Sequence, residues 1–174
     1  MKENTMRAIR VEKITLNIGS GKNPAKLDKG IKLLKTLTGV DPVKTFAHKR
    51  LPAWGLRPGL PIGCKLTLRK GAAYELLPRL LKARDNKLMA AQFDNNGNMA
   101  FGIHEYVDVP GIKYDPDIGI IGFEVCVTLE RNGYRIKRRR IRPSPIPKAH
   151  TISKENAVEF MKKEFKTIIS EGEE

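Results

Sequence analysis

The chain has 174 residues, of which 40% are hydrophobic and 30% are charged, and its formal net charge is +14. This composition excludes a disordered chain, and the length fits one folded domain with a substantial core, spanning residues 1–174. So large a positive charge on so small a protein favours a polyanionic partner.

The sequence shows no sign of a membrane or secreted protein. Residues 1–13, MKENTMRAIRVEK, contain no apolar signal-peptide core, and no apolar run approaches the about 20 residues that a membrane helix needs. Cys64 and Cys126 lie in strand-like runs without C-x-x-C or zinc spacing, which is typical of reduced thiols in the cytosol. We therefore expect a cytoplasmic protein without a membrane partner.

The first predicted element is a strand over residues 11–19, VEKITLNIG. Apolar and polar residues alternate along it, which places Lys13, Thr15 and Asn17 on one face and an aliphatic row on the other. Residues 24–38 follow as a predicted helix, because apolar residues recur at helical spacing and Gly39 supplies a C-terminal stop.

The turn between these elements, GSGK at residues 19–22, is similar to a phosphate-binding loop of nucleotide hydrolases. The motif G-x-x-x-x-G-K-[ST] requires a glycine where this chain has Leu16 and a hydroxyl residue where it has Asn23. Both positions fail, and no obvious acidic strand end follows that could hold a metal ion. A nucleotide-dependent enzyme is therefore only the third alternative for this chain.

Residues 42–74 contain no Asp or Glu. Within this tract the prolines and glycines of LPAWGLRPGLP, residues 51–61, predict a loop, and we expect a protruding basic loop near residues 47–60. Its Trp54 either tucks into the core or is exposed for stacking on a ribose or base, with Arg57 beside it.

The remaining predicted elements mix strands and helices. They are a strand at 63–70, a helix at 72–83 that Pro78 weakens or kinks, a hairpin at 92–103 around Asn-Asn-Gly-Asn, a strand at 123–130, and a helix capped by Ser153 with an apolar stripe of Val158, Met161, Phe165 and Ile168. This order predicts an α+β fold, in which one largely antiparallel sheet carries helices on one face.

If strands 11–19 and 63–70 share the sheet, their outward residues form a single polar face. Gly19 would let bare backbone approach a ligand closely there. Cations and small hydrogen-bonding groups can hold RNA phosphates and 2′-hydroxyls, although the same residues also fit an ordinary solvated face. The side chains of this predicted face are Lys13, Thr15, Asn17, Lys65, Thr67 and Arg69.

Residues 131–154 form a second tract without acidic residues. Solvated surfaces normally mix charges, so two long acid-free tracts favour contact with phosphate, and the alternative is that the charge serves only solubility. Prolines disfavour a long helix here, and we predict a basic C-terminal segment near residues 131–150 that lies on nucleic acid as an extended tail or loop; a nuclear targeting signal is the alternative. Its cations include Arg135, Lys137, Arg138, Arg139, Arg140 and Arg142.

No residue pattern indicates catalysis. His48, His104 and His150 lack metal-ligand spacing, and Asp115 and Asp117 flank a proline in what reads as a turn. We therefore expect no enzymatic activity, no metal, no cofactor and no small-molecule substrate. A DNA-binding protein of the chromatin type remains the alternative to an RNA-binding protein.

Three blocks of the sequence closely resemble, in order, the universal large-subunit ribosomal protein family five, whose members bind 5S ribosomal RNA (5S rRNA). These blocks are VEKITLNIGSG, TFAHKRLPAWGLRPGLPIGCKLTLR and FDNNGNMAFGIHEYVDVPGIKYDP, and the resemblance runs from about residue 8 to residue 130. The ending KAHTISKENAVEFMKKEF is similar to archaeal and eukaryotic members, and we expect an archaeal protein.

The resemblance implies a structural role in the ribosome. Members of the family attach 5S rRNA to the large-subunit rRNA in the central protuberance, reach a small-subunit protein across the interface, and place a basic loop near the elbow of P-site tRNA. By motif position that loop is residues 52–58, and Asn17 and Thr67 match positions that hold 5S rRNA. Phe46 and His48 stand where the family often has cations. The expected rRNA or tRNA contacts in this region are Lys49, Arg50, Ala53, Trp54, Gly55 and Arg57.

Overall fold

The computed structural model describes residues 4–170, so the ends of the predicted domain, residues 1–3 and 171–174, lie outside the described part. A five-stranded sheet has the order β2-β3-β1-β6-β5, and every neighbouring pair in it is antiparallel. Its strands are β1 (Ile9–Gly19), β2 (Val43–Phe46), β3 (Pro61–Arg69), β5 (Met99–Ile103) and β6 (Phe123–Arg131).

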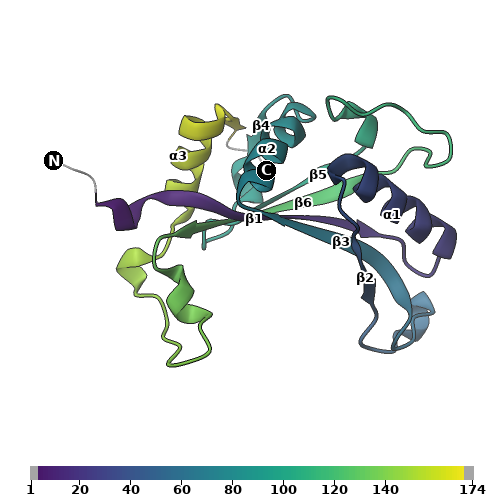
Figure 1. Ribbon diagram of the computed structural model, residues 1–174, viewed down its shortest axis with the longest axis horizontal. Helices are drawn as coiled ribbons and strands as arrows, with labels where there is room; N and C mark the ends of the chain where they lie inside the picture. The colour runs from purple at the N-terminus through teal and green to yellow at the C-terminus, as the bar shows by residue number, and fades with distance from the viewer. Residues whose placement is uncertain (1–3, 171–174) are drawn as a thin grey trace.

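Three helices, α1 (Pro24–Thr38), α2 (Gly71–Lys82) and α3 (Lys154–Phe165), lie on the same side of this sheet (Figure 1). A smaller sheet pairs β4 (Lys87–Met89) with β7 (Ile168–Ser170) in parallel. The prediction of an α+β fold with a mostly antiparallel sheet is confirmed.

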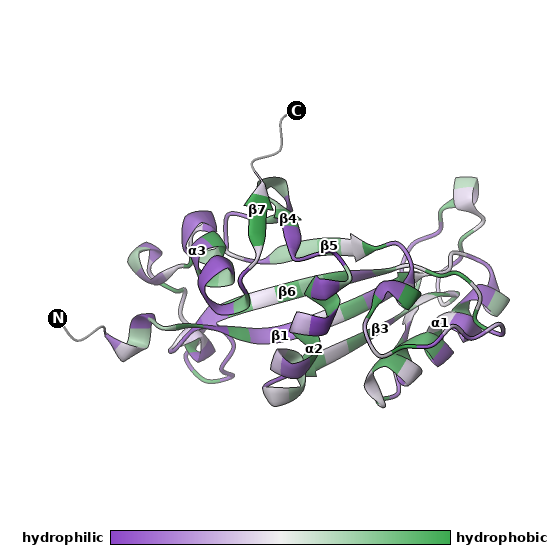
Figure 2. Cartoon of the chain, turned by 90° about the horizontal axis from the view of Figure 1, so that it is seen from above, coloured by the Kyte–Doolittle hydropathy of each residue, from purple (hydrophilic) through white to green (hydrophobic). Residues whose placement is uncertain are grey.

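The central strand β1 contains a β-bulge between Val11 and Lys13. Val11 and Ile14 are both buried on the helix side although they are three positions apart, because the bulge inserts Glu12 as an extra residue. After the bulge, Leu16 continues the buried row by simple alternation, and Figure 2 shows apolar and polar bands alternating along the strands.

Helix α1 has the predicted bounds because both of its ends carry local signals. The Asn23 side chain accepts a hydrogen bond from the Lys26 backbone N–H, Pro24 occupies the first turn, and Gly39 ends the helix in the left-handed conformation with φ +73°. Helix α2 runs through Pro78, whose ring lies on the exposed side of the helix.

Two sequence predictions were wrong in part. The hairpin predicted for residues 92–103 is reduced to one bridge between Phe93 and Met99, and β5 pairs with β6 instead. Ile168 does not extend the apolar stripe of α3, because the left-handed Lys166 ends the helix and Ile168 lies in β7 with 62% of its surface exposed.

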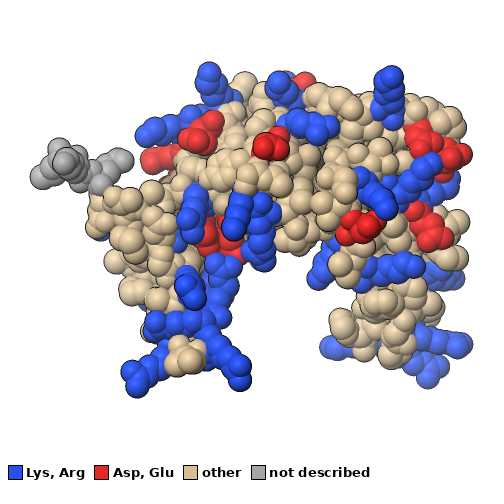
Figure 3. Space-filling model, in the orientation of Figure 1, with Lys and Arg blue, Asp and Glu red and all other residues tan. Residues whose placement is uncertain are grey.

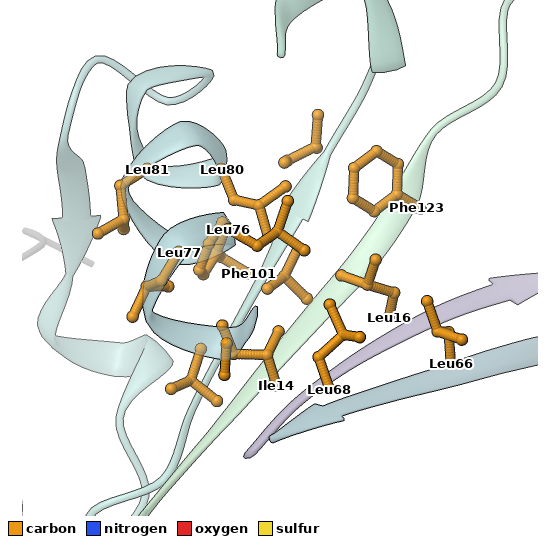
Figure 4. Packing of buried hydrophobic residues seen from close by; sticks show 14 of the residues in the cluster. Ile14, Leu16, Leu66, Leu68, Leu76, Leu77, Leu80, Leu81, Phe101 and Phe123 are labelled. Atoms are coloured by element: carbon orange, nitrogen blue, oxygen red, sulfur yellow. The ribbon is translucent and has the colours of Figure 1, made fainter. Parts of the chain in front are cut away.

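The hydrophobic core fills the space between the helices and one face of the sheet. Leucines of α2 pack against the inward residues of β1, β3, β5 and β6 (Figure 4). Burying one such side chain stabilises the fold by about 1.5–3 kcal/mol, so the helix side of the sheet accounts for most of the stability. The labelled members are Ile14, Leu16, Leu66, Leu68, Leu76, Leu77, Leu80, Leu81, Phe101 and Phe123.

Candidate nucleic-acid interface

Among residues 4–170, no α-helix lies on the opposite side of the sheet (Figure 1). We call it the open face and define it by the outward residues of β1, β3 and β6. The strand register aligns Thr15 with Thr67 and Cys126, and Asn17 with Lys65 and Glu124. Members of the open face are Lys13, Thr15, Asn17, Lys65, Thr67, Arg69, Glu124, Cys126 and Thr128.

The six polar side chains predicted to share one face do lie on this face together. Thr15 Oγ1 and Thr67 Oγ1 are 3.4 Å apart, and Asn17 Nδ2 donates a hydrogen bond to Glu124 Oε2 at 3.3 Å. Gly19 is exposed, and a Cβ built there would meet nothing within 4 Å. The surface therefore offers hydroxyl, amide and cationic groups in rows across adjacent strands.

Sequence reasoning missed the contribution of β6 to the open face. Glu124, Cys126 and Thr128 complete the rows that β1 begins, and Glu124 adds a carboxylate beside Asn17. The alternation in FEVCVTLE did carry this signal, since every second residue of that segment is polar or small. Only the strand order reveals that β6 is next to β1.

The two cysteines lie on opposite sides of the sheet. Cys64 is fully buried, and burial raises the pKa of its thiol from 9.0 to about 11. Cys126 is partly buried on the open face, and its pKa is also raised, first by burial and then by the nearby charge of Glu124. Both thiols are free and protonated at neutral pH.

The predicted basic loop protrudes beyond the sheet on the open side. We call residues 47–60 the tip loop. A short 3-10 helix at Pro52–Trp54 shapes its end, and a bridge between Leu51 and Leu56 closes it. Trp54 is 69% exposed, which resolves the sequence alternative in favour of an exposed tip. The other predicted contact residues of the tip loop are also exposed: Lys49, Arg50, Ala53, Gly55 and Arg57.

The turn that is similar to a phosphate-binding loop supports this region of the fold. The backbone N–H groups of Ser20 and Gly21 both donate to the Ile62 carbonyl, at 2.9 and 3.1 Å. Lys22 reaches the tip loop, because its Nζ is 3.7 Å from the position that a Cβ on Gly55 would take. Lys22 therefore joins the cations near the tip loop, which the sequence alone did not indicate.

The predicted basic C-terminal segment, residues 131–150, forms a second projection that we call the basic arm. It is a loop and not an extended tail, because it begins with a short 3-10 helix at Tyr134–Lys137 and bends back on itself, so that the Ser144 N–H donates to the Ile136 carbonyl at 3.2 Å. Its base is fixed by the buried Tyr134, whose hydroxyl donates to the His150 carbonyl and accepts from the Ile152 N–H. Its predicted cations Arg135, Lys137, Arg138, Arg139, Arg140 and Arg142 are all exposed.

The tip loop and the basic arm extend from opposite ends of the sheet toward the same side (Figure 1). Figure 3 shows Lys and Arg side chains gathered on both projections, with a hollow between them below the sheet. Helices and acidic side chains lie mainly on the other side in that view. The arrangement gives one face with three groups of donors and cations: the open face and its two flanking projections.

Neither a metal centre nor a membrane helix was found among residues 4–170. Within that range no group of three His, Cys, Asp or Glu side chains is placed to hold an ion. No helix there is long and apolar enough to cross a membrane.

Comparison with known proteins identifies the family. Residues 4–57 match the family described as ribosomal protein L5, and residues 61–160 match the model that describes the C-terminus of the same ribosomal family. The chain is 52% identical to the large ribosomal subunit protein uL5 of Nanoarchaeum equitans, over 94% of this chain and 96% of that protein.

Two further relatives carry the same name. The chain is 46% identical to the protein of Sulfolobus acidocaldarius, over 98% of this chain and 96% of the relative, and 43% identical to that of Methanosphaera stadtmanae, over 95% and 99%. These are archaeal ribosomal proteins and not enzymes, which confirms the predicted family, its archaeal branch and the absence of an enzymatic role. The chain belongs to the ribosomal protein L5 family.

Proposed function

We propose that the protein is a structural constituent of the large ribosomal subunit in the cytoplasm, and that it binds 5S rRNA with its open face. In this proposal it helps to attach 5S rRNA to the large-subunit rRNA in the central protuberance. The tip loop contacts P-site tRNA, and another part of the surface meets a small-subunit protein. Residues 1–174 act together as one RNA-binding domain.

The observation that carries the proposal is the position of the polar rows between two basic projections. Cations on the tip loop and the basic arm neutralise phosphates, while Thr15, Asn17 and Thr67 offer small groups that match 2′-hydroxyls. The names of the relatives, all of them proteins of the large ribosomal subunit, support an rRNA partner. The role is positional, because it requires affinity and orientation but no chemical step.

A binding titration at two salt concentrations tests this function. The ligands are 5S rRNA, an unrelated folded RNA of similar length, and duplex DNA. Binding by charge alone weakens for all three, with a log–log slope of about −0.9 per neutralised phosphate on B-DNA. We expect 5S rRNA alone to keep tight binding at the higher salt. An equal loss for all three ligands would contradict the proposal, and a preference for duplex DNA would favour the chromatin-type alternative.

Cys126 provides a site-specific readout in the same experiment. It lies beside Thr15 on the open face, so bound 5S rRNA should slow its alkylation by a small thiol reagent at pH 9. The fully buried Cys64 is an internal control that should stay unreactive in the folded protein with or without RNA. Unchanged alkylation of Cys126 in a saturated complex would place the RNA elsewhere.

A further inference from the structure

Two acidic side chains lie beneath a cluster of arginines where the basic arm meets the sheet. The side chains of Glu12 and Glu130 are each only 10% exposed, whereas the arginines around them are 44–57% exposed. Arg10 binds Glu130 Oε1 through Nε at 2.9 Å and Nη2 at 2.7 Å, and Arg69 Nη1 lies 3.1 Å from Glu12 Oε1. We call Glu12 and Glu130 the carboxylate pair.

Arg138 of the basic arm binds both members of the carboxylate pair. Its Nη1 donates to Glu12 and its Nη2 donates to Glu130 Oε2 at 2.8 Å. Residues 135–146 are all described, and within them no side chain other than Arg138 forms a hydrogen bond or ion pair with the sheet. Tyr134 and the partly buried Ile146 anchor the two ends of the arm in the core, and Arg138 is the polar link that ties the segment between them to the sheet.

The position of these acids is unexpected on electrostatic grounds. A carboxylate near a phosphate-binding surface repels RNA, and burying a carboxylate is costly unless it is paired. A planar guanidinium held by two carboxylates has its orientation fixed, which a lysine ammonium on a flexible stem does not provide. A carboxylate that lowers the affinity for RNA in general can thus raise the preference for one RNA, because it holds a cation in a fixed orientation.

We propose that Glu12 and Glu130 are positioning residues, which hold the basic arm in the orientation that recognises RNA. The proposal rests on the proposed function, because it assigns these acids a part in selecting 5S rRNA. The proposal predicts the opposite of what charge alone predicts for the loss of a carboxylate. Charge alone predicts that loss of a carboxylate strengthens binding to every polyanion, whereas loss of a positioning residue lowers the preference for 5S rRNA over other RNA.

Three variants separate these effects. Glu12→Gln removes one carboxylate of the pair, and Arg138→Lys keeps the charge of the arm but removes the planar fork. Glu75→Gln is the matched control, because Glu75 is a residue of α2 at the surface of the described chain and outside its ion pairs. Circular dichroism establishes folding, and Arg138→Lys keeps the test decisive if Glu12→Gln does not fold.

The first readout is limited trypsin digestion of the free protein. Trypsin cleaves after Lys and Arg, so cleavage between residues 135 and 142 reports how firmly the arm is held. Glu12→Gln and Arg138→Lys should accelerate this cleavage by about threefold to tenfold, which corresponds to the loss of a coupling of about 0.7–1.4 kcal/mol, and Glu75→Gln should not. Unchanged cleavage in both arm variants would refute the proposal regardless of any RNA result.

The second readout is the affinity ratio between 5S rRNA and the unrelated folded RNA. We expect this ratio to fall in Glu12→Gln and in Arg138→Lys, although the latter carries the same charge as the wild-type protein. A Glu12→Gln variant that binds both RNAs more tightly with an unchanged ratio would show that charge alone acts. If the wild-type protein itself shows no preference, the proposed function fails, and trypsin digestion still decides whether the acids hold the arm.

Discussion

The polar side chains of the open face already bond to one another in the free protein. Thr15 and Thr67 are within hydrogen-bonding distance across two strands, and Asn17 donates to Glu124. RNA that binds here has to replace these contacts with better ones, so each residue contributes only the difference between two hydrogen bonds. Such a difference is about 0.5–1.5 kcal/mol. One residue therefore contributes little to the binding free energy, whereas a row of such residues together contributes substantially.

Asn17→Ala and Thr67→Ala should each weaken 5S rRNA binding by about threefold to tenfold, because each removes one hydrogen-bonding group. The free energy of unfolding should change by no more than about 0.5 kcal/mol, since both side chains lie at the surface. Titration with RNA and urea denaturation measure the two quantities. Thr36→Ala on the exposed side of α1 is the control; wild-type affinity in the open-face variants would remove these residues from the site.

The buried thiol of Cys64 makes the stability of the fold depend on pH. Its pKa is raised to about 11 in the fold, so the folded state keeps the proton more firmly than the unfolded chain does. The resulting stability is fully present below pH 9 and is lost as pH rises toward 11. Urea unfolding of the wild-type protein and of Cys64→Ala should therefore show a stability difference that shrinks above pH 9. A constant difference up to pH 11 would contradict the assignment.

At the scale of elements, the exposed end of the tip loop makes few contacts with the rest of the fold. Only Leu56 and Ala47 of this loop are buried, and Lys22 of the preceding turn reaches it from outside. Changes at the tip should therefore leave the core and the open face unaffected, because neither packs against Trp54.

Trp54→Ala should leave both the unfolding temperature and the affinity for 5S rRNA unchanged, and it should impair P-site tRNA handling by ribosomes that contain it. Thermal unfolding, the 5S rRNA titration and a tRNA-binding assay on reconstituted subunits measure these outcomes. A large loss of 5S rRNA affinity would show that the tip loop is part of the 5S rRNA site instead.

Local signals made some elements predictable from the sequence, and tertiary contacts decided the others. Helix α1 was predicted with its observed bounds because Pro24 and Gly39 mark its ends. The predicted hairpin near residues 92–103 was largely wrong, because β5 pairs with β6 along its whole length and meets the segment before the turn at a single bridge. The share of β6 in the open face, and the bonds of Arg138 to Glu12 and Glu130, depend on strand order and on segments far apart in sequence. No local pattern contains that information.

At the scale of the whole molecule, the sheet divides two tasks between its sides. Helices and core leucines occupy one side, and the open face with its two basic projections occupies the other (Figures 1 and 3). A change on the open face therefore alters recognition at little cost to stability, whereas a change on the helix side alters stability first. This separation makes the binding predictions above testable in folded variants.

The β-bulge at Glu12 makes one place in β1 tolerant of the loss of a residue. Deleting any residue from Ile14 to Ile18 would shift the side chains on one part of the strand to the wrong side of the sheet, bringing a polar residue such as Lys13 or Asn17 into the core. Deleting Glu12 would instead restore uninterrupted alternation from Ile9 to Gly19, because Val11 and Lys13 already face consecutive residues of β6, Leu129 and Thr128. We expect the chain without Glu12 to unfold cooperatively, and likewise the chain without Lys13, in which Glu12 takes the outward position. The chain without Thr15 should lose its cooperative transition. The length of this strand can thus vary by one residue, but only at the place where the basic arm is fastened.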